Sequence, residues 1–190
     1  QLVERKRRVG THVIFRSPAR PIHGNIEQAL ESLRNFGRAT QVKLLEVDRV
    51  SARPPIDEAL DLPTGTELLR VVRTRWLDDE PLGHFVSYIP SDLGKAMTRA
   101  SLKTTPMLTL LEQAGAKIGA AHQTISATLA DAAVSASLQV DIGSPILRVS
   151  RTVFDVNERP VQHILAQFRP DRYQIRLDLN SPRILEPQII

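Results

Sequence analysis

A pair of β-rich runs separated by a very short acidic loop constrains the fold more than any other feature. Residues 67–76 and 81–89 are dominated by β-branched and other apolar residues, and Asp78-Asp79-Glu80 lies between them. So short a loop joins antiparallel neighbours, because a parallel connection needs a crossover of a dozen or more residues. Pro90 cannot donate a ladder hydrogen bond and should end the second strand. We therefore expect a long β-hairpin at the centre of the chain.

Similar patterns extend over the rest of the chain. Apolar residues that alternate or cluster between turn residues predict further strands at 41–53, 117–130, 145–155, 160–168 and 173–179. Helical spacing and capping residues predict helices at 25–36, 56–62, 91–99, 106–115 and 131–138. Because tight loops such as 156–159 and 170–172 join neighbouring strands, the predicted class is α+β, with a central, mostly antiparallel sheet flanked by helices.

Positive charge is concentrated at the start of the chain. Residues 1–20 contain six basic residues and one acidic residue, so the other 170 residues carry a net charge of −1 out of the total of +4. We expect residues 2–15 to form a β-hairpin segment with Arg5, Lys6, Arg7 and Arg8 at its tip. A basic arm on a nearly neutral body suggests contact with a polyanion such as DNA, and a solvated charge run at a chain end is the alternative.

Composition excludes several classes of site. The chain has no cysteine, so disulfides, thiolate nucleophiles and cysteine zinc sites are excluded, and a reducing cytoplasm is the expected compartment. No apolar run approaches the ~20 residues that span a bilayer, so no membrane association is expected. The five histidines are not at metal-ligand spacing in the sequence; we expect no metal site and no cofactor.

Two arginines in the first hairpin strand are the sharpest candidate site. Arg73 and Arg75 share one face of the strand, because positions i and i+2 point the same way. Two adjacent guanidinium groups repel each other, and a bound carboxylate or phosphate would relieve the repulsion. A surface pair that forms salt bridges with acidic residues on a neighbouring strand is the alternative interpretation.

Loop length decides which residues face these arginines. A three-residue loop would pair Arg73 with Phe85 and Val71 with Ser87, whereas a two-residue loop would swap the faces. On the later strand, Gln162 and Phe168 share a face by the same alternation, although Phe168 could equally be a core residue. Gly24-Asn25 opens a predicted helix, whose free N–H groups could bind an anion or could be satisfied by an ordinary N-cap.

Three stretches of the sequence together resemble a known family. Residues 2–13 resemble the wing of the winged helix-turn-helix in GntR-superfamily transcriptional regulators. Two further stretches resemble the effector-binding UTRA domain of the HutC subfamily. They carry its motifs in the same order between about residues 20 and 180. These motifs are 73–82 followed by 87–90, then 143–147 with Arg151, 159–162 and 171–173.

The resemblance implies a bacterial one-component regulator with a chorismate lyase-like fold, usually a homodimer. It implies a wing remnant at 1–16, a linker at 17–24, the UTRA domain at 25–180 and a tail at 181–190. In such a regulator, Arg5, Lys6, Arg7 and Arg8 would contact DNA. The recognition helix would lie upstream of residue 1, so this chain is not expected to read DNA sequence by itself.

The resemblance also implies effector-binding roles for particular residues. Arg73 and Arg75 match family positions that contact the anionic part of the effector, and Gly24-Asn25 matches a turn that binds its phosphate in some members. Phe85 and Gln162 stand where the family often has glutamate, and Phe168 where it often has tyrosine. With Ser87 on the arginine face, these residues predict a small anionic effector, a carboxylate or phosphate ester, without a strongly cationic group.

Two other function classes compete with a regulator. The shared fold allows a chorismate lyase-like enzyme acting on a small carboxylate, and an empty pocket would leave a pure dimerisation module. The sequence contains no evident nucleophile, acid–base pair or phosphate-binding loop. Because a basic wing has no role in such an enzyme, a ligand-sensing regulator is the interpretation that the sequence favours.

Overall fold

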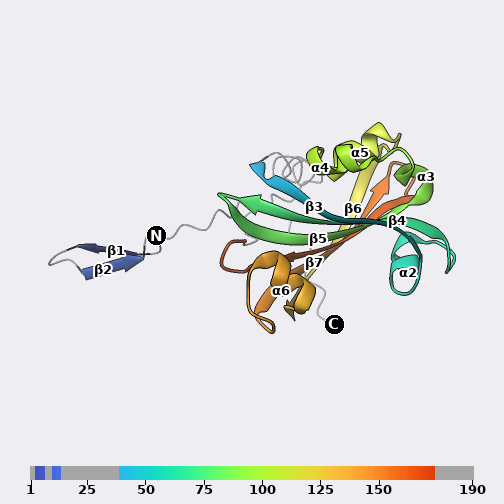
Figure 1. The fold of residues 1–190 in the computed structure, drawn as a ribbon. Helices are drawn as coiled ribbons and strands as arrows, with labels where there is room; N and C mark the ends of the chain where they lie inside the picture. The colour runs from blue at the N-terminus through green and yellow to red at the C-terminus, as the bar shows by residue number, and fades with distance from the viewer. Residues whose placement is uncertain (1–2, 7–9, 14–38, 174–190) are drawn as a thin grey trace, which may run out of the picture.

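A six-stranded antiparallel sheet forms the body of the computed structural model, which describes residues 3–6, 10–13 and 39–173. The strand order is β3-β4-β5-β8-β7-β6 (Figure 1). The strands are β3 (Gln41–Ser51), β4 (Glu67–Leu77), β5 (Glu80–Pro90), β6 (Ile118–Leu129), β7 (Pro145–Asp155) and β8 (Pro160–Phe168). The predicted α+β class, with its antiparallel sheet, is confirmed.

Short helices cover both faces of this sheet (Figure 1). One face carries α3 (Ser91–Gly94), α4 (Arg99–Thr104) and α5 (Met107–Gln113), and the other carries α2 (Ile56–Leu60) and α6 (Ala132–Leu138). Asp131 caps α6, as expected, by accepting a hydrogen bond from the Val134 N–H at 2.8 Å. The helices therefore form two layers, one against each face of the sheet.

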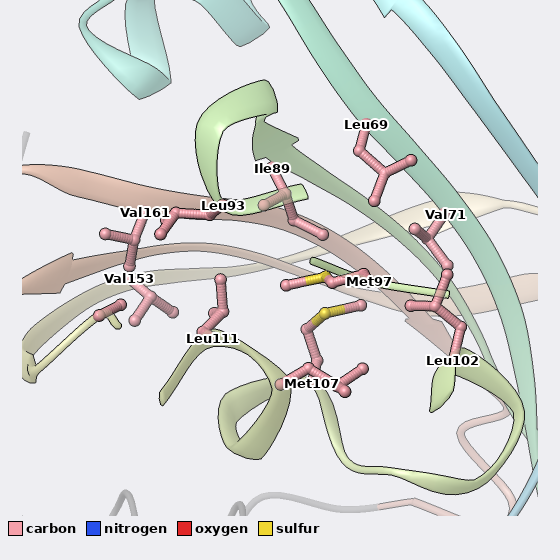
Figure 2. Close-up of a cluster of buried hydrophobic side chains, with 12 residues drawn as sticks. Leu69, Val71, Ile89, Leu93, Met97, Leu102, Met107, Leu111, Val153 and Val161 are labelled. Carbon is pink, nitrogen blue, oxygen red and sulfur yellow. The ribbon is translucent and has the colours of Figure 1, made fainter. Parts of the chain in front are cut away.

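The largest apolar cluster lies between the sheet and α3–α5 (Figure 2). Leu69 and Val71 of β4 and Ile89 of β5 meet side chains from the helices, among them Leu102 and Leu111. Val71, Ile89, Leu102 and Leu111 are completely buried. Burying side chains of this size contributes roughly 1.5–3 kcal/mol each, so this cluster holds α4 and α5 on the sheet.

The connection at Asp78-Asp79-Glu80 differs from the three-residue loop considered above. Asp78 and Asp79 have φ angles of 52° and 59°, and Leu77 pairs directly with Glu80. The turn thus has two residues, both left-handed, which is the geometry that suits the twist of a hairpin. The register nevertheless pairs Arg73 with Phe85 and Val71 with Ser87, because a bulge at Leu82 inserts one extra residue into β5.

The predicted helix over 91–99 is wrong in its length. The structure has α3 over Ser91–Gly94 and a separate α4 from Arg99. Thr98 explains the break, because its side chain and that of Ser101 form a reciprocal capping box that starts a new helix. Pro106 is the N-cap of α5 rather than its first helical residue.

Some predictions near the chain ends lie outside the described residues. A separate two-stranded sheet pairs β1 (Val3–Lys6) with β2 (Gly10–Val13), which places Arg5 and Lys6 in a strand rather than in the predicted tip. Arg7, Arg8, the predicted helix 25–36 with Gly24-Asn25, and residues 174–179 of the last predicted strand fall outside the part of the chain that the structure describes.

Candidate functional site

Six of the predicted site residues lie on one face of the sheet. Arg73 and Arg75 come from β4, Phe85 and Ser87 from β5, and Gln162 and Phe168 from β8. The register pairs Arg73 with Phe85 and then with Ala166, and pairs Arg75 with Gly83 and then with Phe168. Residues two apart in a strand point to the same side, so this alternation and the register across the three strands together bring the six to one face. We call this side, which also carries α3–α5, the arginine face.

Arg73 is buried with its charge beside neutral groups. Its side chain is only 4% exposed, and Nη1 donates to the carbonyl oxygens of Thr105 at 3.3 Å and Leu102 at 3.5 Å. No carboxylate of the described chain lies within ion-pair distance of it. Burial, together with repulsion from Arg75, lowers the pKa of Arg73 to about 9. The charged form is thus held in an environment that disfavours it.

Arg75 is also buried, at 6% exposure. Its Nη1 donates to Thr40 Oγ1 at 2.7 Å, and its Cζ lies 5.9 Å from the centre of the Phe85 ring, a cation–π distance. Burial lowers the pKa of Arg75 to about 10. The alternative of a surface arginine pair is therefore wrong, because both side chains are inside the protein.

Aromatic rings border the two arginines on one side. Phe85 and Phe168 meet edge to face with ring centres 5.2 Å apart, and Phe168 stacks on Tyr173 at 3.9 Å. With Leu82, Val149 and Ala166 they form an apolar cluster. Phe168 is therefore a core residue that also lies on the arginine face, so its two interpretations are compatible.

Ser87 and Gln162 supply neutral polar groups in the interior. Gln162 Nε2 donates to Ser87 Oγ at 3.0 Å, and both residues are buried. Gln162 is 3% exposed and Ser87 is 1% exposed. This pair links β5 to β8 without adding charge, so it offers no carboxylate to a cation.

A third arginine on this face, Arg151 of β7, was not singled out as a site residue. Alternation from Val149 and Val153, both buried, places it on the arginine face. Its Nε donates to Gln123 Oε1 at 2.8 Å, and burial lowers its pKa. In the sequence, the position of Arg151 midway between Val149 and Val153 indicates that it shares their strand face.

In the turn after β8, Asp171 pairs with Arg169 rather than with its chain neighbour Arg172. Arg169 holds Asp171 through Nε at 3.2 Å and Nη2 at 2.7 Å, and Arg172 contacts Glu80. Hydrogen bonding from Arg169 lowers the pKa of Asp171. The fork of Arg169 reaches both carboxylate oxygens, which a neighbouring residue pointing the other way cannot do.

The histidines and the helices add two observations. Within residues 3–6, 10–13 and 39–173 no group of three or more histidine, aspartate or glutamate side chains is placed to hold a metal ion. His163 lies on the opposite face from Gln162, and its Nδ1 is 2.9 Å from Thr152 Oγ1. None of the described helices has the length and hydrophobicity needed to cross a membrane.

Comparison with known proteins gives a consistent family relationship. Residues 36–174 match the family model described as the UTRA domain. The chain is 29% identical over 162 residues to a protein of Escherichia coli named "Probable fructoselysine utilization operon transcriptional repressor", covering 80% of this chain and 66% of that one. It is 31% identical over 159 residues to the HTH-type transcriptional regulator Rv0792c of Mycobacterium tuberculosis, covering 82% and 57%.

Solved structures show the same fold. A GntR-family transcriptional regulator of Enterococcus faecalis superposes with a TM-score of 0.66 and 27% identity, over 73% of this chain and 99% of that one. PhnF of Mycobacterium smegmatis superposes with a TM-score of 0.73 over 95% of this chain and 79% of that one, at 18% identity. The chain spans less than two thirds of the length of the curated relatives it matches.

Proposed function

The chain belongs to the UTRA domain family, and from this premise we propose that it is the effector-binding and dimerisation domain of a bacterial one-component transcriptional regulator of the HutC subfamily. Its relatives are named as transcriptional regulators and repressors. In this proposal a small anion binds at the arginine face and controls DNA binding in the cytoplasm. No catalytic reaction is assigned to it, so incubation with chorismate should release no pyruvate.

The observation that carries the proposal is the buried charge of Arg73. A guanidinium group removed from water without a carboxylate partner is costly, commonly by several kcal/mol. Arg75 on the same strand face increases the positive potential, and its repulsion contributes to the lowered pKa of Arg73. A bound carboxylate or phosphate would offset both costs through charge-assisted hydrogen bonds.

The neighbours of the arginines define the rest of the effector. Phe85 and Phe168 offer ring surfaces to an apolar or aromatic body. Ser87 and Gln162 are neutral, so a ligand ammonium would enter without a carboxylate partner from these positions, at a considerable desolvation cost. We therefore propose a small carboxylate or phosphate ester without a strongly cationic group.

Binding of DNA belongs to the whole regulator. We propose that Arg5, Lys6, Arg7 and Arg8 contact phosphate from a wing at residues 1–16, that residues 17–24 link it to the UTRA domain at 25–180, and that 181–190 form a tail. Gly24-Asn25 would complete the effector site at the start of the domain. These roles rest on the family resemblance and on the basic composition of the segment.

A thermal shift screen tests the proposal. A ligand that binds only the native state raises the melting temperature, and well above its dissociation constant the stabilisation grows with the logarithm of the ligand concentration. Matched organic acids, phosphate esters and amines of equal size should be compared on the same protein. The proposal expects stabilisation by acids or phosphate esters, and stabilisation by amines alone would contradict it.

A further inference from the structure

A cavity lies on the sheet face opposite the arginine face. It has a volume of about 510 Å³ and is lined by residues of β3, β4, β5, β7 and β8 together with α2 and the segment before it. Tyr88 and His163 line it, and each is the direct chain neighbour of an arginine-face residue, Ser87 and Gln162. Strand alternation sends such neighbours to opposite sides, so the sheet separates the two sites completely.

One end of this cavity is apolar. Leu68 of β4 and the ring of Tyr88 meet Ile56 and Ala59 of α2 there, and Leu68 and Ile56 belong to the apolar cluster that fixes α2 to the sheet. The Pro54-Pro55 segment closes the same end. A surface of this kind holds an apolar ring or chain by removing it from water.

The wall of the cavity also carries positive charge that the protein does not fully neutralise. Arg70 is paired with Glu46 at 2.6 Å and Asp48 at 3.2 Å. Arg148 and Arg53 line the same cavity, and neither has a carboxylate within ion-pair distance in the described part of the chain. Together with Arg70 and its two carboxylate partners, these arginines give the wall a net charge of +1, and this charge favours an anion.

Neutral polar groups also line the cavity. His163 contacts Ser150 Oγ through Nε2 at 3.3 Å and Thr152 Oγ1 through Nδ1 at 2.9 Å. Burial lowers the pKa of His163, so at neutral pH it adds a hydrogen-bonding ring rather than a charge. The cavity volume falls within the range of small-molecule sites, about 300–1,000 Å³.

We propose that this cavity is a second ligand site, distinct from the effector site, for a small organic anion with an apolar body. The apolar body would lie against α2 and Tyr88, and the anionic group would lie toward Arg148. The inference stands on the cavity's own shape and charge and does not depend on the effector proposed for the other face.

Titration with 8-anilinonaphthalene-1-sulfonate tests this directly, because the dye combines an aromatic body with one sulfonate and fluoresces when it leaves water. We expect saturable binding to the folded protein. Ala59→Phe, which fills the apolar end, should abolish it. Arg148→Met should weaken it about fivefold, the scale of one partly exposed charge interaction. Ala136→Phe on the exposed face of α6 and Arg99→Met on α4 are the matched controls.

Several results would overturn the proposal. No saturable binding by the wild type would do so, as would equal binding by Ala59→Phe and Ala136→Phe in variants whose near-UV circular dichroism is native. Loss of the dye signal in Arg75→Ala but not in Arg148→Met would place the dye at the effector site instead. A change of oligomeric state in Ala59→Phe would identify the cavity as a subunit interface.

Discussion

Two buried guanidinium groups determine what the arginine face can bind. Arg73 donates to the neutral carbonyl oxygens of Leu102 and Thr105, so these hydrogen bonds satisfy its donors without cancelling its charge. Arg75 donates to the Thr40 hydroxyl. Because Phe85 and Gln162 are neutral, these neighbours add no negative charge to the face. Two features therefore favour an anion over a cation: the position of the arginines, and the absence of a carboxylate at positions 85 and 162.

Introducing a carboxylate at Gln162 should reverse this preference. Gln162→Glu places a potential negative charge on the arginine face, where it competes with a ligand anion and offers a partner to an ammonium. We expect organic-acid affinity to fall at least about fivefold, or about 1 kcal/mol, and amine affinity to rise. Isothermal titration measures both. Gln167→Glu, on the other face of the same strand, is the control and should leave acid binding unchanged.

At the scale of elements, alternation predicted which candidate residues share a face within each strand, whereas the turn that sets the register between β4 and β5 has two residues rather than three. The left-handed Asp78-Asp79 turn and the bulge at Leu82 compensate each other, and nothing in the local sequence indicates the bulge. The division of helix 91–99 depends on the Thr98–Ser101 capping box, which competes with a helical pattern that would otherwise continue. Arg151 was missed as a candidate because only the pairing of β7 with β8 brings it beside the other residues of the arginine face.

The hairpin turn offers a stability test. Asp79 has a φ of 59°, a conformation that costs a non-glycine residue about 1 kcal/mol and costs glycine nothing. Asp79→Gly should raise the free energy of unfolding by about 0.5–1 kcal/mol in urea denaturation. Asp79→Ala should lower it, because alanine retains the strain and loses the side chain's local hydrogen bonding. Equal effects of the two substitutions would contradict the turn assignment.

The attachment of α6 to the sheet should depend on pH. His84 of β5 lies 2.8 Å from Ser137 of α6, from Nδ1 to Oγ, and burial lowers the pKa of His84 below its ordinary value of 6.5. Below about pH 6.5 the unfolded chain therefore binds more protons than the folded one. The contribution of His84 to the free energy of unfolding is complete above that pH and is lost as the pH falls. Urea denaturation at pH 7.5 and pH 5 should show the loss. This loss of stability should be smaller in His84→Gln. The control is His122→Gln, which changes an exposed histidine. An unchanged pH dependence in His84→Gln would exclude His84 as its source.

At the scale of the whole molecule, the sheet separates two different environments. The face with α3–α5 contains the large apolar cluster and the buried arginines, and the face with α2 and α6 contains the basic cavity. The fold class followed from the tight loops between strands. The cavity could not be predicted in this way, because its residues come from five strands and α2, which no local pattern connects.

The domain should also be a homodimer, as its family implies. Sedimentation equilibrium of the purified chain at tens of micromolar should give twice the mass of 21.2 kDa. Only monomer at that concentration would mean that this chain does not supply the dimer interface, although it would leave the effector site intact.

The central claim is that an anion binds at Arg73 and Arg75, and isothermal titration of the wild type and Arg75→Ala tests it most directly. The titrant is the acid or phosphate ester that gives the largest thermal shift, with an amine of equal size beside it. We expect the wild type to bind the acid more tightly than the amine. Arg75→Ala should weaken binding of the acid by about 1.5–3 kcal/mol, the scale of a charge-assisted hydrogen bond. Replacing the exposed Arg99 of α4 (Arg99→Ala) should leave binding of the acid unchanged. Tighter binding of the amine, or equal affinity of the acid for the wild type and Arg75→Ala, would contradict the account.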